Sequence, residues 1–349
     1  MRIIPFLGLT LGALLLAACG GGGGGGSSGT GSPVVQQPGV AITAANQISV
    51  ARATVGGGLT LSNSPLPLES EDRASALSLR SSPMPASIGF IDATVRRALL
   101  GGLQSRRSVL SAGARPAGTS SETQPCAVGG SLTTTFDDRD NNGAPSASDT
   151  LTLAFNQCSD TSAEQSSGTV VFTISSVSSL TEDRIEMAAS LAFQHVSLVQ
   201  GETSATIDGS VTFSLLATSS SVQMSLAVGS GGLTVATVAP QYSDTIAFAS
   251  GMQIIASEAG ATSGTVSLNG AFTATSIGGQ VTVATLQAFT GSATATYPSA
   301  GRLLVTGAGG SQLRITVIDA TQLSLELDAA GDGTFETTTL VPWSELRPV

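Results

Sequence analysis

The feature that most constrains this chain is an alternation of apolar and polar residues from about residue 126 to near the C-terminus. Val170, Phe172 and Ile174 show it, and it returns at residues 210–215 and 323–327. Successive side chains of a strand point to opposite faces, so this period of two predicts half-buried antiparallel strands. The sequence therefore predicts an all-β domain over residues 124–349, a large antiparallel meander of about a dozen strands.

The same pattern leaves the arrangement of the sheet open between a barrel-like form and a sandwich. A transmembrane barrel is disfavoured because its aromatic girdles are missing: the chain has one Trp and two Tyr. Four glycines, Gly168, Gly209, Gly264 and Gly291, stand at the start of apolar runs. Their spacing is unequal, which predicts strand entries rather than a solenoid repeat.

The N-terminus has the organisation of a bacterial export signal. Arg2 precedes an apolar run, residues 3–16, that is too short to span a bilayer as a helix. The run ends in Leu16, Ala17, Ala18 and Cys19, which resembles the lipobox of bacterial lipoproteins. The resemblance implies cleavage of residues 1–18, acylation of Cys19 and, since Gly20 is no retention signal, an outer-membrane location. The alternative is an ordinary secretory signal with a chance cysteine.

Between this leader and the strands, composition predicts little order. Residues 19–85 begin with a glycine run and stay rich in Ser, Pro, Ala and Gly, which is typical of a flexible tether and a low-order segment. Residues 86–110 differ, because apolar side chains recur there at the spacing of one helical face. These are Ile88, Ile91, Val95, Leu99 and Leu103. We expect one short amphipathic helix in this segment.

Two cysteines remain once Cys19 is set aside. Cys126 and Cys158 lie equally far from a turn near Asn142, so strands on either side of that turn would bring them together. An exported protein folds in an oxidising compartment, and the sequence therefore predicts a Cys126–Cys158 disulfide. A reactive thiol pair is the less favoured alternative, since no close spacing or cationic neighbour lowers a thiol pKa.

The turn between these cysteines is acidic. Asp138, Asp140, Asn142 and Asp149 occupy the first, third, fifth and twelfth positions of an EF-hand-type loop, with Gly143 at the sixth. We predict calcium ligands at these four residues, although the last lacks the longer Glu and an ordinary hairpin tip remains the alternative. A second acidic turn, residues 328–336, has Ala330 at a ligand position and is read mainly as a hairpin turn.

Composition excludes several functions. The net charge of -10 disfavours nucleic acid, whose phosphates require a cationic face. All basic residues are arginine, so a Ser/Lys dyad, a Schiff base and a phosphate-binding loop are impossible. The single histidine, His195, lies in an alternating stretch and is expected to be a strand residue. We therefore predict that the protein is not an enzyme.

Two functions remain compatible with the sequence. The first is a membrane-anchored envelope lipoprotein that acts as a structural or interaction module for an unknown envelope partner and is stabilised by calcium. The second is a carrier or chaperone for an apolar ligand or lipid, held in a β-lined cavity with residues 88–103 as a lid or plug. The body is also similar to uncharacterised Gram-negative envelope lipoproteins, a resemblance that implies no specific activity.

Overall fold

The computed structural model describes residues 38–62, 118–143, 145–180, 184–218, 220–240, 242–259, 263–292 and 297–346. The signal peptide, Cys19, the glycine run and the helix predicted at residues 86–110 lie outside the described residues. Within them, one α-helix, fifteen strands and two short 3-10 helices occur. No described helix is long and apolar enough to cross a membrane.

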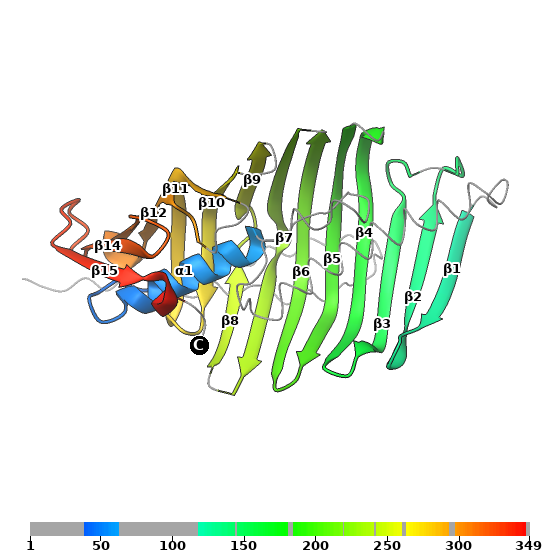
Figure 1. Cartoon of the computed structure of the whole chain (residues 1–349), viewed down its shortest axis with the longest axis horizontal. Helices are drawn as coiled ribbons and strands as arrows, with labels where there is room; N and C mark the ends of the chain where they lie inside the picture. The colour runs from blue at the N-terminus through cyan, green and yellow to red at the C-terminus, as the bar shows by residue number, and fades with distance from the viewer. Residues whose placement is uncertain are drawn as a thin grey trace, which may run out of the picture. The chain divides into compact units, whose positions relative to one another are not determined.

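All fifteen strands belong to one antiparallel sheet (Figure 1). The strand order follows the chain from β1 to β8 and from β10 to β15, while β9 pairs with β7 and β10. The predicted all-β meander is confirmed, and it starts at Gly118 rather than at residue 124. The strand path is open, with β1 and β15 at its ends.

The strands vary from six to nineteen residues in length, and the longest ones lie together from β4 to β7. Their bounds are β1 Gly118–Pro125, β2 Gly129–Asp138, β3 Thr150–Thr161, β4 Glu164–Leu180, β5 Arg184–Gln200, β6 Thr203–Thr218, β7 Ser221–Ala239, β8 Tyr242–Phe248, β9 Gln253–Ala259, β10 Ser263–Ala274, β11 Gly279–Ser292, β12 Ala300–Thr306, β13 Gln312–Val317, β14 Gln322–Asp328 and β15 Thr337–Pro342.

Side-chain burial follows the alternation seen in the sequence. In β13, Leu313, Ile315 and Val317 are buried, and the residues between them are partly exposed. The register pairs Leu313 with Leu327 and Ile315 with Leu325, so apolar side chains of neighbouring strands meet on one face. Full burial of such a side chain contributes about 1.5 to 3 kcal/mol, which makes this face the main source of stability.

Two of the glycines expected at strand entries lie inside strands, opposite bulges. Gly168 in β4 has φ +104° and faces the bulge that contains His195 in β5. Gly209 in β6 has φ +121° and faces Gly232 in β7. A Cβ at either glycine would collide with the backbone of the bulged strand. The strand-entry prediction is wrong here, because these glycines make room for extra residues in the next strand.

The other two glycines lie at strand ends: Gly264 is the second residue of β10, and Gly291 is the last residue but one of β11. Gly264 of β10 and Gly291 of β11 are direct partners in the register of those strands. The strand-entry prediction is therefore confirmed for Gly264 and wrong for Gly291.

An ordered segment occurs where the sequence predicted a lack of order. Helix α1, Gln47–Ser62, buries Val50 and Ala51 and packs against β9, β10, β13, β14 and the 3-10 helix η2, Trp343–Leu346. Arg52 donates two hydrogen bonds to the carbonyl oxygen of Glu345. The low-order prediction is wrong for residues 38–62, because this segment gains its order from contacts with distant strands.

The residues before α1 are tied to the sheet. The amide of Val40 donates to the carbonyl oxygen of Gln280 in β11, and the amide of Ala308, in the 3-10 helix η1 (Ala308–Gly310), donates to the carbonyl of Val40. The Ser311 hydroxyl accepts from the amide of buried Ile42. These bonds hold the start of the described chain against its C-terminal half.

We expect Gly168→Ala to lower the free energy of unfolding by about 2 to 4 kcal/mol, because it combines a left-handed backbone with a backbone collision. Gly201→Ala is the matched control: Gly201 also has a positive φ, but its Cβ would meet open space. Its cost should be about 1 kcal/mol. Urea unfolding of the two variants measures the difference, and equal losses would contradict the role given to the bulge.

Candidate functional site

The candidate site is the acidic loop that joins β2 to β3. The two strands pair in register from Ser131 with Asn156 to Asp137 with Thr150. The open end of this hairpin is closed by the predicted disulfide between Cys126 and Cys158, whose Cα atoms are 5.4 Å apart. The disulfide prediction is confirmed. It fixes both strands that lead into the loop.

Three predicted ligands converge in the loop. Carboxylate oxygens of Asp138, Asp140 and Asp149 all lie within 4.8 Å of one another. Asp138 ends β2 and Asp149 immediately precedes β3, and both side chains are buried, whereas Asp140 is exposed. The antiparallel pairing of the two strands therefore brings together carboxylates that are separated by the loop in the sequence.

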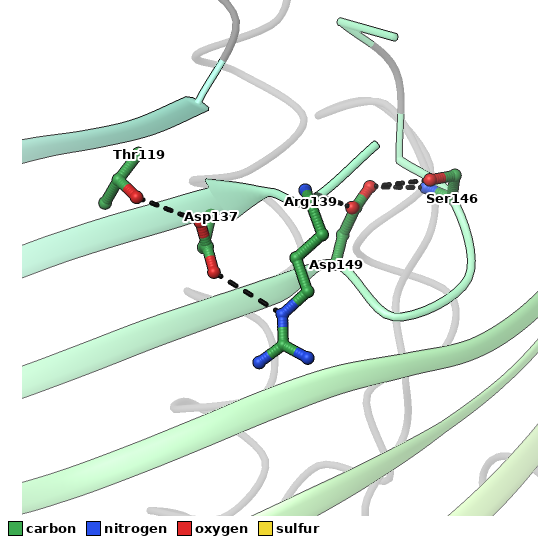
Figure 2. Close-up of polar contacts among 5 residues, drawn as sticks. All are labelled: Thr119, Asp137, Arg139, Ser146 and Asp149. Carbon is green, nitrogen blue, oxygen red and sulfur yellow. Dashed lines mark hydrogen bonds and ion pairs between the residues drawn. The ribbon is translucent and has the colours of Figure 1, made fainter. Parts of the chain in front are cut away.

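The buried carboxylates are hydrogen-bonded to the backbone of the loop. Asp138 accepts from the amides of Asn142 at 3.2 Å and Gly143 at 2.8 Å. Asp149 accepts from the amide of Arg139 at 3.0 Å and from the amide and hydroxyl of Ser146 at 2.7 and 3.0 Å (Figure 2). Asp side chains commonly close turns in this way. Each buried charge is thus compensated locally.

Asp140 is held by side chains as well. The Ser146 hydroxyl, whose single proton is shared between Asp149 and Asp140, lies 2.8 Å from Asp140, and the Asn142 side-chain amide donates to Asp140 at 2.7 Å. The bond from Ser146 is the main cause that lowers the pKa of Asp140, against a smaller opposing effect of burial. Ser146 belongs to the site, but the sequence reasoning missed it. Its position three residues before Asp149 was the available signal, since Ser favours such turns.

A surface pair flanks the loop on the β2 side. Figure 2 shows the Arg139 guanidinium beside Asp137, with Nε 3.5 Å from the carboxylate. The hydroxyl of Thr119 in β1 donates to the same carboxylate at 2.9 Å. Both partners of the ion pair are exposed, so water screens it and its contribution is small.

The arrangement offers hard oxygen donors, which are the ligands that Ca²⁺ prefers. The six carboxylate oxygens of Asp138, Asp140 and Asp149 also accept hydrogen bonds from within the loop. The loop is therefore closed by its own donors, and a cation would have to share or displace them. Calcium binding stays a prediction.

The second acidic turn is stabilised in the same way, by a buried carboxylate that accepts hydrogen bonds from backbone amides. Asp328, fully buried at the end of β14, accepts from the amides of Gly331, Asp332 and Gly333 at 2.6 to 3.2 Å. Oxygens of Asp328, Asp332 and Glu336 lie within 4.8 Å of one another. The turn joins β14 to β15, as expected of a hairpin. Its similarity to the first loop indicates that turn closure is the shared role of the buried carboxylates.

His195 lies in β5, as expected of a strand residue, and is exposed at the bulge opposite Gly168. Its Nδ1 is 2.6 Å from Asp208 Oδ1, which also accepts from the His195 amide. The hydrogen bond to Asp208 is the main cause that raises the pKa of this imidazole. The pair fixes the bulge at the surface.

Comparisons with protein-family models, with curated proteins and with solved structures found no match to this chain.

Calcium added to the purified protein is predicted to raise its melting temperature. A site with a dissociation constant of about 0.1 mM would contribute about 2.7 kcal/mol at about 10 mM calcium. Asp140→Asn should abolish this increase, whereas Asp208→Asn, which removes a carboxylate outside the loop, should retain it. A melting temperature independent of calcium in the unmodified protein would rule the site out.

Removal of the disulfide should destabilise the fold without changing its strand content. The cysteines are 32 residues apart, and the chain-entropy model gives a loss of about 3 to 4 kcal/mol for a loop of this size. The double variant Cys126→Ser, Cys158→Ser tests this by urea unfolding and circular dichroism. An unchanged midpoint would show that the link contributes nothing to stability.

Proposed function

We propose that the protein is a non-catalytic β scaffold of the bacterial cell envelope, anchored to a membrane by lipid on Cys19. Two features support the envelope location. The sequence from Leu16 to Cys19 resembles a lipobox. The body contains the Cys126–Cys158 disulfide, and structural disulfides persist mainly in oxidising compartments outside the cytoplasm.

The observation that carries the scaffold role is the hydroxyl-rich face opposite the apolar one. The register places Thr150, Thr173, Ser190 and Thr212 beside one another in β3 to β6. All four are partly or fully exposed. Neighbouring strands are about 4.8 Å apart, so the hydroxyl groups form a regular row across the sheet.

The row extends in both directions. Asp137 of β2 pairs with Thr150, and beyond Thr212 the register continues through Ala227 to Gln253 of β9 and Asn269 of β10. Hydroxyl and amide groups both donate and accept hydrogen bonds, and most of the row is uncharged. Such a surface suits many weak contacts with a polar envelope component along its length.

The hydrogen bonds of the buried carboxylates support a structural role for the protein. Asp244 in β8 accepts from the amide and hydroxyl of Ser276 and from the hydroxyl of Thr275, which ties β8 to the turn after β10. Burial acts to raise the pKa of Asp244, but these hydrogen bonds more than offset it and the pKa is lowered. Like Asp138 and Asp328, this ionised group stabilises a turn.

Replacement of Cys19 tests the anchor. We expect Cys19→Ala to move the protein from the membrane fraction to the soluble envelope fraction, since no acyl chain can be attached. Ser27→Ala is the matched control in the same N-terminal segment and should remain in the membrane fraction. Unchanged membrane fractionation of Cys19→Ala, or an unacylated mature N-terminus by mass spectrometry, would refute the anchor.

A further inference from the structure

The apolar face of β3 to β7 is covered. Val170, Leu191, Phe213 and Leu215 are 0%, 2%, 5% and 2% exposed. The rings of Phe172 and Phe213 also contact each other there, with centroids 5.7 Å apart. A single sheet cannot bury its own face, because the side chains stand side by side and need a second layer above them. Something must therefore pack on this face.

The described elements supply that layer for the other half of the sheet. Helix α1 packs against β9, β10, β13 and β14, with η2 beside it (Figure 1). The described contacts of β3 to β6, in contrast, are chiefly those with their neighbours in the sheet. The cover for this part of the face must come from the remainder of the chain or from a bound molecule.

We infer that residues 63–117 of this chain supply the second layer over β3 to β7. Fifty-five residues separate Ser62, the last residue of α1, from Gly118, the first of β1. They connect a helix that packs on the C-terminal half of the sheet to the strand at the opposite end of the strand order. From β7 to β1 the distance is about 29 Å at about 4.8 Å per strand. The shortest connection between these two points runs along this part of the sheet.

The sequence of the segment fits that position. Ile88, Ile91, Val95, Leu99 and Leu103 recur at the spacing of one helical face. A helix over residues 86–110 would be about 37 Å long, which is enough to cross the strands from β1 to β7. An apolar stripe of this length matches the apolar face in both chemistry and extent.

The inference bears on function without depending on the lipid anchor. A carrier of an apolar molecule needs this same face for its ligand. If the chain itself fills the face, the core is closed and the protein works through its outer surface. A carrier with residues 88–103 as a plug would also place this segment on the face, so only a co-purified lipid on the face would favour the carrier.

A photo-crosslinking experiment on the full-length chain identifies the occupant. Benzoylphenylalanine in place of Leu99, on the apolar stripe, is expected to crosslink to peptides of β4 to β6, for example residues 189–193 or 211–215. The same group in place of Ala93, on the opposite side of the stripe, should not. Crosslinks from position 99 to a co-purified lipid, or to no part of the sheet, would overturn the inference.

A second measurement uses charge in place of a bulky probe. Val95→Asp should expose the apolar face and raise the fluorescence of a bound hydrophobic dye several-fold. Ala93→Asp, with the same change in charge, should leave it near that of the unmodified protein. Equal behaviour of the two variants would contradict the assignment of the stripe to the sheet.

Discussion

Burial of one continuous apolar face is the constraint on which the rest of this structure depends. The strands join one antiparallel sheet, and the cross-strand register aligns their apolar residues, as Leu313 with Leu327 illustrates. A shift of one residue in any strand would turn its apolar side chains to the polar face, so the register is strongly determined. The same alternation places the row from Thr150 to Thr212 on the opposite face.

Long strands in such a sheet require local irregularities. Gly168 and Gly209 accommodate bulges in the adjacent strands, and bulges bend a strand and increase its twist. At the ends of strands, buried carboxylates stabilise the turns. Asp138 and Asp328 each collect amide hydrogen bonds from the turn that follows, so that backbone donors which would otherwise lack partners are satisfied. The buried carboxylates of the acidic loops therefore serve first of all to stabilise turns.

Much of the candidate site could be predicted from the sequence. The disulfide and the convergence of Asp138, Asp140 and Asp149 follow from a hairpin whose two strands are visible as alternating runs. Ser146 was missed because its hydroxyl joins the site only after the loop has folded back on Asp149. The order of residues 38–62 was missed for a related reason. The stability of α1 comes from strands that are about two hundred residues or more away along the chain.

The sequence alone determined the all-β class, the antiparallel pairing and the disulfide. It also excluded reaction mechanisms that require a lysine. It could do so because strand periodicity and residue type are local properties. Only the tertiary structure decided that the strands form one open sheet, that α1 packs on its C-terminal half, and that Gly168 and Gly209 face bulges. These features depend on contacts between distant segments, whose geometry a pattern of period two does not contain.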